Sequence, residues 1–254
     1  MDNEKELQQL RNRFRDLADK SFSRNMFTFT GFLGLSEQDV FWQMERELSH
    51  AKFVLSGGAE GTDRQMVRFG NGQDLGYEVD FPIVCIHICP LLAKFADKLT
   101  HRDFLGALMN LGIERSTLGD IRVGDREAYL FCLDSIAEYI CENLTQVKHT
   151  NVKCQVVERA AEVPMEEPRR ITVQAASMRA DAVLAKVYNK SREDSLMLFR
   201  AQKVFVDGRL CENNARQLKV GETVNARGYG KFRVAGEPKE TKKGRTAVEV
   251  EVYG

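Results

Sequence analysis

Three consecutive residues, His101, Arg102 and Asp103, have the types and order found in the catalytic loop of protein kinases. A kinase also needs an Asn five positions after that Asp, a glycine-rich loop and an Asp-Phe-Gly metal site, and the sequence has none of them. We therefore expect Thr100 and Asp103 to form the capping box of a helix. His101 and Arg102 then stand exposed at its first turn, where they could hold a phosphate.

A glycine-rich stretch, GGAEG, begins at Gly57. A phosphate-binding loop would continue with Gly-Lys-Ser/Thr and a helix, whereas here Thr-Asp-Arg precedes the strand-like run RQMVRFG. We interpret the stretch as a connection between two strands. It remains a candidate contact surface, formed by Gly57, Gly58 and Arg64.

Cys85, His87 and Cys89 alternate, so on a strand they share one face and form a candidate set of three zinc ligands. The sequence has no Cys-x-x-Cys pair and no second half of such a site, so we predict no metal. The six cysteines lie mostly in apolar segments, where they act as free thiols in a reducing compartment.

Nucleophile and base pairs are equally hard to assemble. The four histidines, at positions 50, 87, 101 and 149, belong to no recognisable catalytic motif. The sequence therefore predicts no catalytic residues, no cofactor and no enzymatic activity.

The periodicity of apolar residues predicts an α+β protein with three small domains. Residues 1–77 hold a helix over 3–21, a strand, a helix opened by Ser36 with Asp39 completing its capping box, and two more strands. Residues 78–160 show the order strand, helix, strand, strand, helix, strand, which is typical of a ferredoxin-like or RRM-like domain. Its third strand carries Tyr129 and Phe131 without the usual glycines, so we expect both rings to pack in a core.

Residues 161–176 contain two prolines and no apolar periodicity, and we interpret them as a linker. Residues 177–254 begin with two short amphipathic helices, the second capped by Ser191 with Asp194. A hairpin follows, in which Asp207 and Gly208 suit a two-residue turn. The remaining segments are strands.

The chain has 254 residues and no net charge, but its charges are unevenly distributed. From Met178 to the end there are 16 Lys and Arg against 10 Asp and Glu, which leaves 21 against 27 in the preceding residues. This asymmetry favours a polyanionic partner for the C-terminal third. The charged N-terminus and the short apolar runs predict neither a signal peptide nor a membrane span, and hence a cytoplasmic protein.

At the C-terminus the sequence resembles the S-four RNA-binding module, named for a small-subunit ribosomal protein. The resemblance lies in Arg179-Ala180-Asp181, Ser191-Arg192, the run from Lys203 to Gly208, Gly221-Glu222 and the run from Arg227 to Phe232. Ala180 stands where the module has Leu, Gln202 where it has Gly, and Asp207 where Asn is common. The resemblance implies RNA contacts from nine residues: Arg179, Lys190, Ser191, Arg192, Arg200, Lys203, Arg209, Arg227 and Lys231.

Over essentially the whole chain the sequence resembles the YlmH family of bacterial proteins. The stretch HRDFLGALMNLGIERSTLGDI is the most specific part, together with the glycines from Gly57 to Gly61. The resemblance implies a non-enzymatic, monomeric factor that binds ribosomal RNA of the large subunit with peptidyl-tRNA, in the rescue of stalled nascent chains. His101, Arg102, Gly57, Gly58 and Arg64 are additional candidate ribosome contacts. The alternatives are an RNA-modifying enzyme with an appended S-four module and an adaptor protein in cell division.

Overall fold

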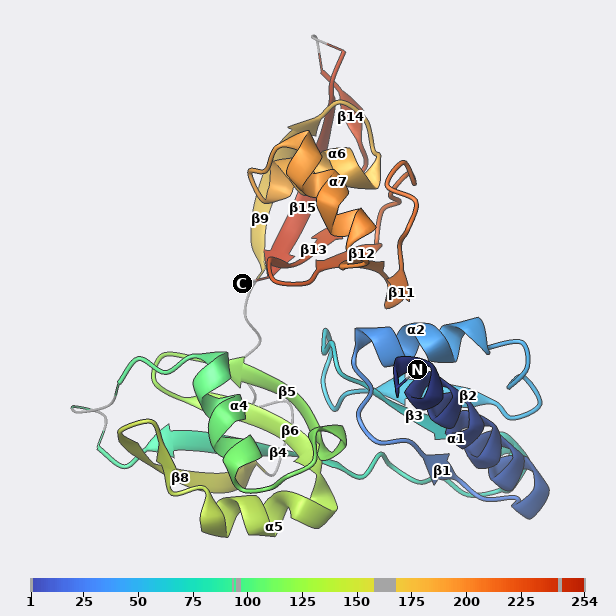
Figure 1. Cartoon of the computed structure of the whole chain (residues 1–254), viewed down its shortest axis with the longest axis vertical. Coiled ribbons are helices and arrows are strands. Elements are labelled where there is room, and N and C mark those ends of the chain that lie inside the picture. Colours follow the sequence, from blue (N-terminus) through green and yellow to red (C-terminus); the bar gives the residue numbers. More distant parts are fainter. Residues whose placement is uncertain (1, 93, 95–96, 158–167, 242–243, 254) are drawn as a thin grey trace. The chain divides into compact units, whose positions relative to one another are not determined.

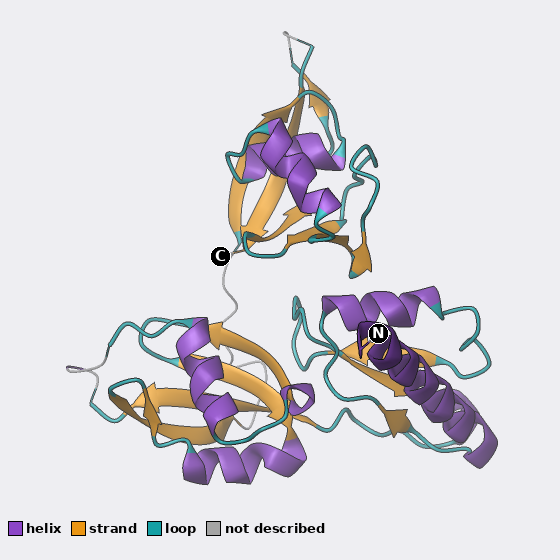
Figure 2. Cartoon of the chain, in the orientation of Figure 1, coloured by secondary structure: helices purple, strands orange, loops and turns teal. Residues whose placement is uncertain are grey.

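The computed structural model describes residues 2–92, 94, 97–157, 168–241 and 244–253. The chain divides into two compact units, residues 1–164 and 165–254, and each is described by itself (Figures 1 and 2). In the described part of the chain, no helix combines the length and the apolar character that crossing a membrane requires.

The first unit begins with a long helix that packs on a small antiparallel sheet. Strand β3 is central and pairs with β1 and β2. The core joins Phe14 of the first helix to Phe41 and Phe69, with ring edges meeting ring faces. The elements are α1 (Asp2–Arg24), β1 (Thr28–Phe29), α2 (Leu35–Gln43), β2 (Phe53–Ser56), β3 (Met66–Phe69) and α3 (Gly72–Leu75).

The start of α2 differs from the prediction. Its N-cap is Gly34, whose N–H donates to the carboxylate of Glu37 at 2.6 Å. The carboxylate of Asp39, which was expected to close a box with Ser36, accepts a hydrogen bond from Gln43 at 2.8 Å instead. Both registers offer a carboxylate three residues after the cap, so local sequence does not separate them.

The same unit continues with a five-stranded antiparallel sheet in the order β5-β6-β4-β8-β7. Helices α4 and α5 contribute Phe104, Leu108, Ala137 and Ile140 to the core on one face of this sheet. The predicted chain order of strand, helix, strand, strand, helix, strand is present, with β7 added. The elements are β4 (Ile83–Pro90), α4 (His101–Asn110), a 3₁₀ turn (Arg115–Thr117), β5 (Leu118–Val123), β6 (Ala128–Leu133), α5 (Asp134–Asn143), β7 (Gln146–Val147) and β8 (Thr150–Val157).

The two sheets of the first unit are joined through a shared apolar cluster. Phe32 and Met66 pack there with Cys85 and Phe131 of the second sheet. Asp120 adds polar links, because its carboxylate accepts the backbone N–H groups of Asp63 and Arg64 at 2.6 and 3.0 Å. Residues 1–77 and the following sheet therefore stabilise one another.

The second unit has two helices packed on one face of an antiparallel sheet (Figure 1). The strand order is β11-β10-β12-β13-β15-β14, and β9 also pairs with β15. The elements are β9 (Arg169–Ala175), α6 (Ala180–Val187), α7 (Arg192–Arg200), β10 (Val204–Val206), β11 (Arg209–Leu210), β12 (Thr223–Ala226), β13 (Gly230–Val234), β14 (Lys239–Glu240) and β15 (Thr246–Tyr253).

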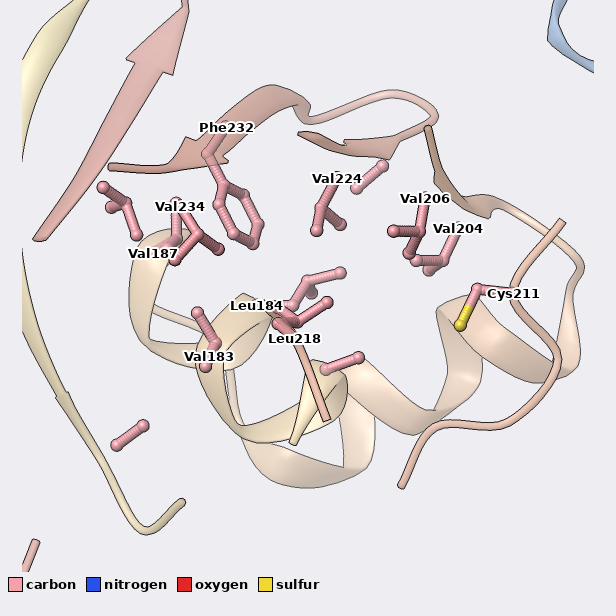
Figure 3. Close-up of a cluster of buried hydrophobic side chains, with 14 of the residues drawn as sticks. Val183, Leu184, Val187, Val204, Val206, Cys211, Leu218, Val224, Phe232 and Val234 are labelled. Carbon is pink, nitrogen blue, oxygen red and sulfur yellow. The ribbon is translucent and has the colours of Figure 1, made fainter. Parts of the chain in front are cut away.

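Figure 3 shows the core of this unit between the helices and the sheet. Val183, Leu184 and Val187 of α6 meet Val224 and Phe232 of the sheet, and all five are buried. The alternation along each strand sends every second side chain to this core and the others to the opposite face of the sheet.

Strand β9 corrects the predicted linker. Residues 161–167 lie outside the described residues, but Arg169–Ala175 forms a full strand paired with β15. Val173 and Ala175 are buried, and Ile171 packs against the same core. The alternation Ile-x-Val-x-Ala was overlooked because the arginines and Pro168 at its start dominate the composition of the stretch.

The predicted hairpin turn is confirmed. Val206 pairs with Arg209, so Asp207 and Gly208 alone form the turn. Their φ angles are 49° and 76°, the positive values that a two-residue hairpin turn requires. The carboxylate of Asp207 also accepts the N–H of Thr223 at 2.8 Å, which ties the turn to β12.

Candidate nucleic-acid interface

Helix α7 begins and ends with an exposed arginine, and its position is fixed by its cap. The Ser191 hydroxyl accepts the N–H of Asp194 at 3.0 Å, and the Asp194 carboxylate accepts the Ser191 hydroxyl at 2.7 Å. These hydrogen bonds from Ser191 hold the pKa of Asp194 below its usual range. The predicted capping box is confirmed, and the Ser191 side chain serves as the cap.

The other face of α7 anchors the helix. Leu198 and Phe199 are buried in the core, and the Ser195 hydroxyl donates to the carbonyl of Asp181 in α6 at 2.9 Å. Arg192 and Arg200 are exposed. The helix therefore holds two cations in solvent about 12 Å apart along its axis, at 1.5 Å per residue.

The turn between α6 and α7 places a third cation against an aromatic ring. The ammonium of Lys190 lies 4.9 Å from the centre of the Tyr229 ring in the β12–β13 turn. Tyr229 is 43% exposed, and its ring centre is 5.9 Å from that of Tyr188. A cation and an exposed aromatic ring side by side suit both a phosphate and a nucleic-acid base.

The chain after α7 brings two more cations together. The N–H of Arg227 donates to the carbonyl of Lys203 at 2.9 Å, so residues 24 apart in sequence are neighbours. The guanidinium of Arg227 lies over the ring of Phe205, 5.1 Å from its centre. Gln202 makes the turn into β10 with a φ of 53°, which explains why a glycine suits this position in the S-four module.

Lys190, Arg192 and Arg200 lie on or beside α7. Lys203 and Arg227 lie at the adjacent end of β10 and β12, where the Arg227 guanidinium covers Phe205 on the sheet face opposite the helices. We call these five cations the basic rim: Lys190, Arg192, Arg200, Lys203 and Arg227.

Four of the nine candidate contacts in this unit lie outside the basic rim: Ser191, which caps α7, and Lys231, Arg209 and Arg179. Lys231 lies on the sheet face opposite the helices, with its ammonium 5.5 Å from the centre of the Tyr253 ring. Arg209 begins β11, beyond the hairpin turn. The guanidinium of Arg179 donates two hydrogen bonds, of 2.7 and 3.0 Å, to the buried carboxylate of Asp181.

Asp181 shows why Arg179 is needed inside the fold. Burial by itself would raise the pKa of this carboxyl, but hydrogen bonds from Arg179 and Asn214 outweigh that effect and lower it. The pair therefore keeps a charged carboxylate in the core between α6 and the loop that joins β11 to β12. We assign Arg179 a structural role.

Among the candidate contact residues of the first unit, His101 and Arg102 differ in their availability to a phosphate. Thr100 and Asp103 form the predicted capping box, with the carboxylate 2.8 Å from the Thr100 nitrogen. Burial and the nearby positive charge of Arg115 lower the pKa of His101, so this imidazole is largely neutral at pH 7. Arg102 is exposed and lines a groove along α4, so it is the cation of this pair that remains available to a phosphate.

Gly57, Gly58 and Arg64 each have a structural role inside the first unit. A Cβ on Gly57 would lie 2.2 Å from the Thr62 hydroxyl, and one on Gly58 would lie 2.8 Å from the Phe131 ring. The guanidinium of Arg64 donates to the carbonyls of Phe32, Arg115 and Leu118 at 2.8 to 3.0 Å. Gly58 and Arg64 thus help to join the two sheets of the first unit, whereas Gly57 allows close packing within the β2–β3 connection.

Two kinds of comparison identify relatives of the chain. Residues 77–161 match the family model described as "Putative RNA-binding domain in YlmH". The chain is also 25% identical to "Ribosome-associated protein quality control protein P2" of Bacillus subtilis (strain 168) over 226 residues, which are 87% of this chain and 86% of that protein. The chain therefore resembles the YlmH family, most specifically over residues 77–161.

A solved YlmH structure has a similar fold. It is described as "Cell division protein ylmH from Streptococcus pneumoniae", with a TM-score of 0.50, 18% identity, and coverage of 63% of this chain and 95% of that one.

The five-stranded sheet of the first unit does not offer a row of open aromatic rings among its described residues. Phe131 is 1% exposed, beneath Gly58 and Phe32. Tyr129 stacks on His87, with ring centres 4.7 Å apart, and His87 also bonds Glu127 at 2.7 Å. The prediction that Phe131 packs in a core is confirmed.

The three candidate zinc ligands do share a face of β4, but His87 is engaged by Glu127. Burial raises the pKa of Cys85 to about 12, which opposes the thiolate that zinc binds. No group of three metal-binding side chains occurs among the described residues.

Sequence reasoning missed two features of the interface. Tyr229 lies between two glycines in a basic turn, a pattern that indicates an exposed ring and that could have identified it. Lys148 of the first unit follows the short strand β7, whose two residues carry no pattern that predicts an exposed cation there.

Proposed function

We propose that this chain is a non-catalytic RNA-binding factor that works at the ribosome in the cytoplasm. Its C-terminal unit docks as an S-four module on RNA of the large subunit that carries peptidyl-tRNA, in the rescue of stalled nascent chains. The observation that carries the proposal is the basic rim, which combines α7 and its flanking residues with the end of β12, and in which Lys190 and Arg227 lie over aromatic rings. The match of residues 77–161 to an RNA-binding family and the name of the Bacillus relative support it.

Phosphates explain the composition of the rim better than a protein partner does. Its five side chains are cations, and Lys190 and Arg227 are stacked over rings so that their positions are partly fixed. Each phosphate neutralised releases counterions, so binding should weaken steeply with salt. A surface for a protein partner would instead combine an apolar centre with few lysines.

Binding of the full chain to purified large subunits tests the proposal. Arg192→Glu with Arg200→Glu should weaken binding and lower the salt slope by roughly 1.4 to 1.8, as expected for two lost phosphate contacts. The matched control is Lys239→Glu with Arg245→Glu, an exposed pair outside the rim, which should bind like the unmodified chain. Equal binding by both double variants would remove α7 from the interface.

Cross-linking on subunits with and without peptidyl-tRNA tests the finer part. Cross-links from the rim to tRNA should appear only when peptidyl-tRNA is present. Rim cross-links to ribosomal RNA alone, unchanged by peptidyl-tRNA, would limit the proposal to the subunit.

The name of the streptococcal structure favours a second candidate function, an adaptor in cell division. A pull-down before and after nuclease digestion separates the two. Partners that persist after digestion would favour the adaptor, and partners lost with the RNA would favour the ribosomal factor.

A further inference from the structure

A polar groove lies along α4, on the helical side of the five-stranded sheet of the first unit. It has a volume of about 550 Å³ and is open to solvent. Its lining residues come from α4, the end of α5 and the β7 turn: Arg102, Asp103, Gly106, Ala107, Asn110, Leu111, Asn143, Leu144, Thr145, Gln146 and Lys148.

The groove offers cations and amides with a single carboxylate. Arg102 and Lys148 supply two positive charges, and the Lys148 side chain remains 49% exposed while pairing with Asp103 at 3.1 Å. The other carboxylate oxygen of Asp103 is occupied by the cap of α4. Asn110, Asn143 and Gln146 add amide groups, which can both donate and accept hydrogen bonds as base edges do.

Gly106 gives an independent indication of a ligand. It is exposed in the middle of α4, and a Cβ at this position would meet nothing within 4 Å. Its backbone is helical, so neither a turn nor internal packing requires a glycine there. Glycine in a helix interior costs about 1 kcal/mol relative to alanine. The bare backbone leaves one wall of the groove open to a close approach from outside.

The occupant that fits is RNA held mainly through its bases. Residues 77–161 carry nine Lys and Arg against twelve Asp and Glu, so the domain as a whole repels a polyanion. Only one or two phosphates can be neutralised here, by Arg102 and Lys148. A single-stranded RNA segment could place an unpaired base on Gly106, where the base edge would form hydrogen bonds with the amide side chains.

We propose that this groove is a binding site for single-stranded RNA, with phosphates at Arg102 and Lys148 and a base over Gly106. The site deepens the proposed function by giving residues 78–160 their own RNA contact. This contact lies on the helical side of the five-stranded sheet, whereas the opposite face around Phe131 is closed. It rests on that function only in requiring that the chain meets RNA.

The test uses the full chain and a thiouridine-containing single-stranded RNA of about twelve nucleotides, with cross-links mapped to peptides. Gly106→Gln fills the groove with a better helix former, so it should fold at least as stably while cross-links to residues 101–110 and 143–148 fall about tenfold. Gly106→Ala removes the helix penalty but adds a methyl group where the base lies, so its cross-links should fall to a level between those of the unmodified chain and of Gly106→Gln. Arg102→Gln with Lys148→Gln should also weaken these cross-links, whereas Lys153→Gln, an exposed change on β8, should not.

The outcomes separate this site from the basic rim. Cross-links in the groove that survive Arg192→Glu with Arg200→Glu support the site even if the rim fails. Absence of groove cross-links in the unmodified chain, or full cross-linking by Gly106→Gln, overturns the proposal. If Gly106→Gln also bound more weakly than the unmodified chain to ribosomal particles whose exposed RNA had been digested, the groove would bind a polypeptide instead.

Discussion

At the scale of single residues, Arg179 illustrates a basic side chain whose first duty is internal. It neutralises the buried Asp181, whose pKa is lowered in the folded protein. The pair therefore stabilises the fold fully above the pKa of an unfolded Asp. This stabilisation is lost as the pH falls towards the lower pKa of the folded protein. We expect Arg179→Met to lower the free energy of unfolding at pH 7, and to do so less at pH 3, which lies below the pKa of an unfolded Asp. Urea denaturation at both pH values measures this. The control is Lys186→Met, an exposed change on the same helix; equal losses for Arg179→Met at both pH values would contradict the pairing.

Gln202 is the second instructive residue. A side chain in the left-handed region is strained, and a glycine there relieves the strain at the cost of a more disordered unfolded chain. We expect Gln202→Gly to stabilise the second unit by about 0.5 to 1 kcal/mol, measured by thermal unfolding. Gln202→Ala keeps the positive φ and should not stabilise. A gain from alanine equal to that from glycine would show that strain is not the cause.

At the scale of elements, the cap of α7 holds the rim in place. Ser191→Ala should destabilise the second unit by about 1 kcal/mol, because the N–H of Asp194 loses its acceptor. RNA affinity should fall in parallel, since Arg192 lies in the first turn. Ser191→Asn preserves a capping oxygen and should retain both properties. If Ser191→Asn bound RNA as poorly as Ser191→Ala at unchanged stability, the hydroxyl would be a direct contact.

At the scale of the whole molecule, the two units should unfold separately. The second unit has its own core, whereas the first joins its two sheets through Arg64 and the cluster around Phe131. We expect Arg64→Met to lower the unfolding midpoint of the first unit only, because three carbonyls lose their donor. Hydrogen exchange read by mass spectrometry resolves the units. Faster exchange throughout the second unit would contradict their independence.

The sequence by itself determined the features that depend on neighbours a few residues away. The boxes at Thr100 and Ser191 and the Asp207–Gly208 turn are closed by contacts within three residues, so their residue types reveal them. Local reading failed at Ser36, where two overlapping registers offer equivalent caps, and at β9, where charged neighbours hid an alternating pattern.

Only the tertiary structure decided which basic residues form a surface. The backbones of Lys203 and Arg227 meet because β10 and β12 pair, and Lys190 meets Tyr229 because the end of α6 lies beside the β12–β13 turn. Arg64 and Arg179 look like surface cations in the sequence, yet carbonyls and a carboxylate from distant segments take up their donors. The physical reason is that a hydrogen bond or ring contact between residues far apart exists only once the fold has brought them together, and no local pattern encodes that distance.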